Sequence, residues 1–158
     1  MKTEALAAQL LRRLKEQGRT LATAESCTGG GIGHVLTAIP GSSAVYLGGV
    51  ISYTNGVKAG LLHVPKQILD TVGAVSPETA EAMVLGVRSA IGADVGISVT
   101  GLAGPDSDGS DKPVGLVYAA AGDGKTTLVR ENIFPGDRED VRNQAIREAL
   151  RLALELTN

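Results

Sequence analysis

Hydrophobic residues that recur every three or four positions predict helices along much of the chain. In the first such segment, leucines at positions 6, 10, 11 and 14 share one face, and Gly18 stands where a helix would end. Ser76 followed by Pro77 is typical of a helix start, with serine as the N-cap and proline in the first turn. The predicted helices cover residues 2–17, 32–39, 58–63 and 76–90, with a last one that opens at 135–137 and continues to 153.

Short apolar runs between these helices predict strands. They cover residues 20–25, 45–53, 94–100, 114–121 and 125–134. The last two runs flank a Gly-Asp-Gly sequence at 122–124, which predicts a hairpin, and residues 101–113 have the composition of a loop. The Thr-Asn-Gly sequence at 54–56 predicts a turn before the short helix.

Strands that alternate with helices predict a three-layer α/β/α fold, in which helices cover both faces of a mostly parallel sheet. The length of 158 residues is that of one domain, so we expect a single domain over residues 1–158. We expect a five-stranded mixed sheet in the order 2-1-3-4-5, with strand 4 antiparallel because of the hairpin. In such a sheet, ligands bind at the carboxyl ends of the strands where the order reverses, here between strands 1 and 3.

Composition and charge narrow the classes of function. A net charge of -2, with one Phe, three Tyr and no Trp, is unfavourable for nucleic-acid binding, which relies on basic surfaces and aromatic stacking. A single cysteine excludes an internal disulfide, and two isolated histidines are a poor ligand set, so we expect no metal and no cofactor. The sequence shows no signal peptide and no membrane-spanning run, which predicts a cytoplasmic domain without a membrane partner.

The stretch AESCTGGGIG, residues 24–33, follows the first predicted strand and holds a carboxylate, two possible nucleophiles and a run of glycines. Ser26 ends the first strand, and Thr100 and Gly101 end the third, so both polar turns fall at the predicted crevice. The N–H groups after Ser26 open a helix and would bind an anion, either a phosphate or a developing oxyanion. The alternative interpretation is structural, with Ser26 or Thr28 as the N-cap of that helix.

Other polar residues are expected at the same edge of the sheet. Tyr53 ends the second strand, Lys58 follows one helical turn later, and Arg138 and Arg142 share a face of the last helix. Lys58 is a possible base for a serine, although at its ordinary pKa holding it neutral at pH 7 costs about 4–5 kcal/mol. Cys27 has no histidine beside it in the sequence, which favours packing over a role as nucleophile.

Two further groups have simpler interpretations. Ser42 and Ser43 are turn residues before the second strand, at the sheet edge opposite to the crevice. Asp106, Asp108 and Asp111 lack the terminal glutamate of an EF-hand, which indicates a solvated loop rather than a metal site.

Six ordered blocks of the sequence resemble the CinA C-terminal domain family. The blocks are AESCTGG (24–30), PGSSAVYLGGVISYTNGVK (40–58), GAVSPETA (73–80), SVTGLAGPDS (98–107), KPVGLVY (112–118) and GDREDVR (136–142). They span nearly the whole chain. The resemblance implies an amidohydrolase of nicotinamide mononucleotide (NMN), also called NMN deamidase, which releases nicotinate mononucleotide and ammonia in the salvage of pyridine nucleotides.

The resemblance also implies roles for residues inside these blocks. It implies a serine amidase with a Ser–Lys pair, and the matching positions are Ser26, Ser43, Tyr53, Lys58 and Thr100. The topology favours Ser26 as the nucleophile, Lys58 as the base and Tyr53 as a positioning group. Ser43 would have to reach the site on its loop, come from a neighbouring subunit, or orient Lys58. The residues expected to bind substrate are Cys27, Thr28, Gly29, Gly30, Thr100, Gly101, Arg138 and Arg142.

Two other functions fit the same residues. The first is a nucleotide-binding module without turnover, which would use the same crevice. The second is an interaction protein, because related full-length proteins are associated with competence and DNA repair. The glycine-rich segment 46–53 also predicts a surface for a homodimer.

Overall fold

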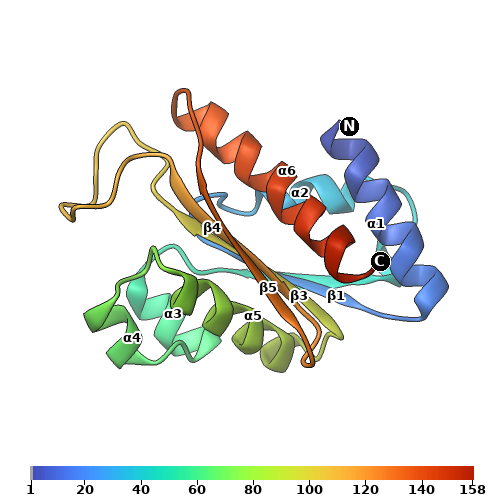
Figure 1. The fold of residues 1–158 in the computed structure, drawn as a ribbon. Helices are drawn as coiled ribbons and strands as arrows, with labels where there is room; N and C mark the ends of the chain where they lie inside the picture. The colour runs from blue at the N-terminus through green and yellow to red at the C-terminus, as the bar shows by residue number, and fades with distance from the viewer. Residues whose placement is uncertain (1) are drawn as a thin grey trace.

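The computed structural model describes residues 2–158 as a five-stranded mixed sheet between two layers of helices (Figure 1). The strands are β1 (Leu21–Glu25), β2 (Tyr46–Ile51), β3 (Val95–Gly101), β4 (Leu116–Gly122) and β5 (Thr127–Ile133). The helices are α1 (Thr3–Gln17), α2 (Gly31–Thr37), α3 (Asn55–Leu62), α4 (Lys66–Thr71), α5 (Pro77–Ile91) and α6 (Arg138–Leu156). The strand order β2-β1-β3-β4-β5, with β4 antiparallel to both neighbours, confirms the predicted fold.

Each face of the sheet packs against its own set of helices. Helices α1, α2 and α6 cover one face, and α3, α4 and α5 cover the other (Figure 1). Leu10 and Leu150, both fully buried, belong to the apolar core on the first face. Met83 and Val87 of α5 pack over the small side chain of Ala22 in β1 on the second. The central strands β1 and β3 are therefore buried on both sides, and only their ends are open to a ligand.

Helix α3 begins earlier than the sequence pattern predicts. Thr54 is its N-cap, and the Thr54 hydroxyl accepts a hydrogen bond of 3.4 Å from the Val57 N–H. The predicted turn at 54–56 is therefore wrong, because these residues start the helix instead of preceding it. Helix α4 was not predicted either: Pro65 stands at its N-cap instead of interrupting the chain.

A close crossing of α3 and α5 holds α3 against the sheet. At Gly86 of α5, a Cβ atom would lie 1.9 Å from the carbonyl oxygen of Leu62, the last residue of α3. Any larger side chain would push the two helices apart. This contact fixes the position of α3, which carries Lys58.

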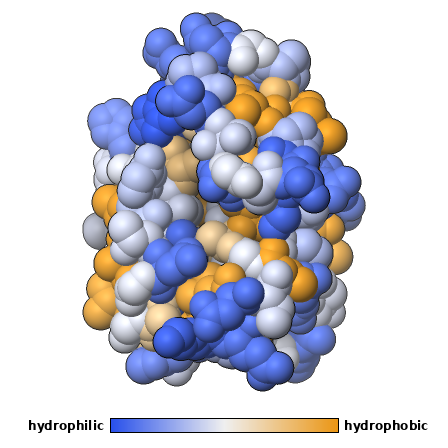
Figure 2. All heavy atoms as spheres, turned by 90° about the vertical axis from the view of Figure 1, so that its left-hand side faces the viewer, coloured by the Kyte–Doolittle hydropathy of each residue, from blue (hydrophilic) through white to orange (hydrophobic). Residues whose placement is uncertain are grey.

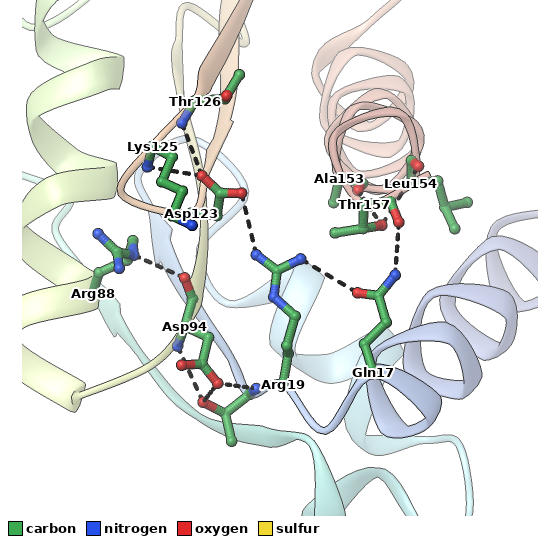
Figure 3. Close-up of polar contacts among 11 residues, drawn as sticks. Gln17, Arg19, Arg88, Asp94, Asp123, Lys125, Thr126, Ala153, Leu154 and Thr157 are labelled. Carbon is green, nitrogen blue, oxygen red and sulfur yellow. Dashed lines mark hydrogen bonds and ion pairs between the residues drawn. The ribbon is translucent and has the colours of Figure 1, made fainter.

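Polar contacts close the edge of the sheet opposite to the predicted crevice (Figure 3). Arg19 forms an ion pair with Asp123 at 3.2 Å, and Asp94 accepts a hydrogen bond of 2.8 Å from the N–H of Thr20. Gln17, at the end of α1, donates to the carbonyl of Thr157 near the chain end at 2.8 Å. The ends of the strands at this edge are thus joined by side chains, whereas the carboxyl edge of β1 and β3 carries the pocket described below.

The turn between β1 and α2 is organised by a buried carboxylate. Glu25 is only 2% exposed and accepts hydrogen bonds from the Thr28 hydroxyl at 2.6 Å, the Ile32 N–H at 2.8 Å and the Gly33 N–H at 3.1 Å. The N-cap residue of α2 is Gly30, which has no side chain to offer. The prediction of Ser26 or Thr28 as the N-cap is therefore wrong, because Glu25 satisfies the first N–H groups of α2 from the preceding strand.

Strand β2 lies at the edge of the sheet and exposes Leu47 and Ile51, which leaves a surface free for a second copy of the chain. The homodimer expected through residues 46–53 stays a prediction. Within residues 2–158, every helix is too short or too polar to cross a membrane.

We predict that Glu25→Gln lowers the free energy of unfolding by about 2 kcal/mol. One oxygen becomes an NH₂ group that faces the N–H of Ile32 or Gly33, leaving a buried donor without an acceptor. Urea denaturation measures the change, with Glu81→Gln on the exposed face of α5 as the matched control. Equal stability of the two variants would contradict the role given to the carboxylate.

Candidate active site

A pocket of about 320 Å³ opens at the carboxyl edge of β1 and β3, where the strand order reverses. Its lining includes Ser26, Cys27, Tyr53, Lys58, Thr100, Gly101, Gly104 and Arg138. Figure 2 views the molecule from the side of the loop between β3 and β4, part of which also lines the pocket. On this face hydrophilic residues predominate and hydrophobic ones form separate patches between them.

A buried lysine and a serine meet at the bottom of this pocket. The Lys58 ammonium donates to the Ser26 hydroxyl at 3.0 Å and to the Ser52 carbonyl at 2.7 Å. Lys58 is 1% exposed and Ser26 is 7% exposed. Ser52 is itself fixed, because its N–H donates to the carbonyl of Glu25 at 2.7 Å. The geometry places a potential base within hydrogen-bond distance of a potential nucleophile.

Burial changes the acid–base properties of Lys58. Withdrawal from water lowers its pKa to about 8, although attraction to the Cys27 thiolate would act in the opposite direction. At pH 7 about a tenth of the lysine is then neutral, and neutralising it costs about 1.4 kcal/mol. The cost of 4–5 kcal/mol for an ordinary lysine is largely removed, so Lys58 is suited to act as a base.

Cys27 is the second possible nucleophile in the stretch. The residue is 6% exposed and is among those that line the pocket, but burial raises the pKa of its thiol to about 12. The thiol is therefore protonated near neutral pH, and the reactive thiolate is rare. The structure favours packing for Cys27, as the sequence suggests.

Thr28, Gly29 and Gly30, which the sequence analysis predicts to bind substrate, are not among the residues that line the pocket. The hydroxyl of Thr28 is used by Glu25, and a Cβ at Gly29 would lie 3.5 Å from Arg142. Gly30 lines a separate groove beside β2. Glu25 accepts from the N–H groups of Ile32 and Gly33, so these two groups are not free for an anion, and the anion site expected at the N–H groups directly after Ser26 stays a prediction.

The end of β3 supplies the opposite wall. The Thr100 hydroxyl donates to the carbonyl of Ala74 at 2.8 Å, which fixes its orientation and leaves its oxygen able to accept a hydrogen bond. At Gly101 a Cβ would lie 2.6 Å from a methyl carbon of Val117. The pairing of β3 with β4 therefore requires glycine at this position, where the wall of the pocket turns into the loop.

Arg138 bridges the mouth of the pocket. Its guanidinium donates to the Tyr53 hydroxyl at 3.0 Å and to the Gly104 carbonyl at 2.5 Å. Tyr53 is 58% exposed, so its hydroxyl is at the rim and not at the base of the pocket. This arrangement joins the start of α6 to the segments that follow β2 and β3.

Two predicted site residues lie elsewhere. Arg142 does not line the pocket; its guanidinium donates to the carbonyls of Cys27 and Thr28 from the other side of the turn. Ser43 is exposed in a short helical turn before β2 and is not among the residues that line the pocket. A catalytic role for Ser43 therefore stays a prediction that would need a second copy of the chain or a moved loop.

Sequence reasoning missed the part played by backbone oxygens and by the loop acids. The Ser52 carbonyl holds Lys58, but no pattern of residue types marks a carbonyl as a ligand. Asp106 and Asp108, interpreted as a solvated loop, are exposed but also line the pocket. Among residues 2–158, no group of three or more His, Cys, Asp or Glu side chains is placed to hold a metal ion.

Comparisons with known proteins agree with this architecture. The nicotinamide-nucleotide amidohydrolase PncC of Pseudomonas putida is 45% identical over 151 residues, which cover 96% of this chain and 94% of that protein. A CinA-like protein of Synechococcus sp. (strain RCC307) is 48% identical over 94% of this chain. That alignment covers only 36% of the Synechococcus protein, so the chain spans about a third of the length of such relatives.

Solved structures share the whole fold. The competence/damage inducible protein CihA of Agrobacterium tumefaciens superposes with a TM-score of 0.95 at 38% identity, covering 99% of this chain and 96% of that one. The sequence model of the CinA C-terminal domain matches residues 3–157. With almost every residue matched and the fold shared, this chain belongs to the CinA C-terminal domain family.

Proposed function

We propose that this protein hydrolyses the carboxamide of NMN to nicotinate mononucleotide and ammonia, as a step in pyridine nucleotide salvage. The observation that carries the proposal is the 3.0 Å contact between the buried Lys58 ammonium and the Ser26 hydroxyl inside a pocket. The substrate is suggested by the Pseudomonas putida relative, which is named a nicotinamide-nucleotide amidohydrolase and matches over nearly its full length.

The reaction would proceed in two stages. Neutral Lys58 takes the proton of Ser26 while the serine oxygen attacks the carboxamide carbon and forms a tetrahedral intermediate. Lys58 then gives that proton to the nitrogen, the C–N bond breaks, and ammonia leaves behind an acyl ester on Ser26. Water gives a proton to Lys58 as its oxygen attacks the ester, the C–O bond to Ser26 breaks, and Lys58 returns that proton to the serine oxygen as the acid product leaves.

Backbone groups help Lys58 to alternate between its two states. The Ser52 carbonyl accepts a hydrogen bond from either the ammonium or the neutral amine, so it holds the nitrogen in place throughout. With one N–H directed at Ser52, the neutral amine can turn its lone pair to the Ser26 hydroxyl. Such fixed geometry is the main requirement for efficient proton transfer.

Arg138 is our proposed ligand for the substrate's 5′-phosphate. It lines the pocket at the rim, opposite to the buried serine, and a guanidinium offers five N–H donors. Binding of the phosphate at the rim would direct the ring and its carboxamide inward, towards Ser26 and Thr100. The predicted cytoplasmic location and homodimer are consistent with this function and stay predictions.

Replacing either Ser26 or Lys58 should abolish turnover while leaving the fold intact. We expect Ser26→Ala and Lys58→Met to lower kcat for NMN by at least about 10³-fold, because each removes a group used in every step. Methionine keeps the length of the buried lysine stem and removes only its charge and donors. Ammonia and nicotinate mononucleotide are measured together in an assay with purified protein.

Ser43→Ala is the matched control because Ser43 is exposed and lies outside the pocket. We expect it to retain wild-type turnover; its loss of activity, with Ser26→Ala active, would transfer the role of nucleophile to Ser43. Wild-type protein that binds NMN without releasing either product would instead support the nucleotide-binding module.

The activity should rise with pH as Lys58 loses its proton. Because the neutral amine is the active form and its pKa is about 8, we expect kcat/KM to increase about tenfold per pH unit below 8 and to level off above it. The measurement is kcat/KM for NMN between pH 6 and 9.5. A plateau already reached at pH 6 would rule out Lys58 as the titrating base.

A further inference from the structure

Thr100, near the end of β3, lies beside Ser26 in the sheet. Strands β1 and β3 are parallel with Glu25 paired to Val99, and the N–H of Ser26 donates to the carbonyl of Val99 at 3.1 Å. Ser26 and Thr100 are the next two residues in this register, and neighbouring strands run about 4.8 Å apart. The proposed nucleophile and Thr100 are therefore adjacent positions at the carboxyl edge of the two central strands.

The side chains of these two residues point towards the same layer of helices. Ser26 accepts a hydrogen bond from Lys58 of α3, and Thr100 donates to the carbonyl of Ala74, three residues before α5 begins. Helices α3 and α5 cover the same face of the sheet (Figure 1). Ser26 and Thr100 also line the same pocket, although Thr100 is only 1% exposed. A substrate carbon bonded to the Ser26 oxygen would therefore lie next to the Thr100 hydroxyl.

The single hydrogen of the Thr100 hydroxyl is already used. The Ala74 carbonyl can only accept, so the hydroxyl is the donor in their contact of 2.8 Å. Within residues 2–158, the Ala74 carbonyl accepts from no other group. Turning the hydroxyl away would leave this carbonyl without a donor, which costs free energy. Thr100 therefore presents only oxygen lone pairs to the pocket.

The chain around Ala74 is itself fixed from both sides. The Lys112 ammonium donates to the carbonyls of Val72 and Val75 at 2.6 Å and 2.5 Å. The carbonyl of Gly73 accepts from two hydroxyls at the N-terminus of α5. The orientation of the threonine hydroxyl is therefore set before any ligand binds.

We propose that Thr100 selects an amide over the corresponding acid, because its hydroxyl oxygen accepts a hydrogen bond from the NH₂ group of the substrate carboxamide. This inference rests on the proposed amidase function and adds a specificity-determining contact to it. A carboxamide has N–H donors where the product acid has only a carboxylate oxygen. Once ammonia has left, two acceptors face each other beside Ser26, which disfavours binding of the product. The same commitment to Ala74 leaves Thr100 unable to donate to an oxyanion.

Binding of three ligands to protein that carries Ser26→Ala tests this contact without turnover. The ligands are NMN, its methyl ketone analogue 3-acetylpyridine mononucleotide, which keeps the carbonyl but has no N–H, and nicotinate mononucleotide. By calorimetry we expect NMN to bind about tenfold more tightly than the ketone, and the added change Thr100→Val to remove that difference by weakening NMN alone. Nicotinate mononucleotide should bind Thr100→Val at least as tightly as before. Thr100→Ser, which keeps the hydroxyl, should retain the preference for NMN.

Ser98→Ala is the matched control for loss of a buried hydroxyl. Ser98 lies two residues earlier on β3 and donates to the carbonyl of Ala80 at 2.6 Å, but it does not line the pocket. We expect it to leave the preference for NMN unchanged. Equal weakening of NMN and the ketone by Thr100→Val would overturn the proposal.

Failure of the proposed function would give a different result. If wild-type protein releases no ammonia from NMN, but the preference for NMN over the ketone exists and is lost in Thr100→Val, only the amidase assignment fails. The comparison of NMN with the ketone needs no change at Thr100, so it holds even if Thr100→Val does not fold. Equal affinities for these two ligands, or no binding of either, overturn the role of Thr100.

Discussion

The burial of Lys58 is the constraint on which the site depends. A lysine that is 1% exposed has lost its hydration, and its partners here are two oxygens, of Ser26 and Ser52, with no carboxylate among them. A carboxylate would stabilise the ammonium and keep its pKa high. The two neutral oxygens accept hydrogen bonds from the ammonium but do not compensate for the hydration that its charge has lost. The lysine is therefore held in place while its pKa is lowered to about 8, so that its neutral form is accessible near pH 7, which is the combination that a base needs.

The rigidity that this burial requires comes from elements far apart in the sequence. The contact between Gly86 and the end of α3 sets the depth of Lys58, while the Glu25 carbonyl fixes Ser52 beneath it. The Glu25 side chain holds the donors of the β1–α2 turn, and Arg142 holds its carbonyls. The carboxylate thus binds N–H groups of this glycine-rich turn, and the guanidinium binds its carbonyls. The path of the turn is therefore set by two charged side chains as well as by the conformational preferences of its backbone.

Much of this arrangement could be predicted from the sequence, for identifiable reasons. The strand order follows from alternating patterns and one hairpin, and it alone places Ser26 and Thr100 at the same edge. Helix α4 gives no periodic signal because Leu69 is its only buried residue. The roles of Glu25 and Arg142 could not be predicted, because they depend on the path of a turn in which Gly29 and Gly30 have positive φ values of 58° and 98°.

The bridge made by Arg138 explains how a pocket built from loops can be ready for substrate. Its two hydrogen bonds, to Tyr53 and Gly104, tie the segments after β2 and β3 to α6. A guanidinium has five donors, so these bonds leave N–H groups for an anion without opening the bridge. Substrate binding then need not order the rim, and the binding free energy is not spent on fixing loops. Deeper in the site, Arg142 likewise orders the backbone beside Ser26 before any ligand arrives.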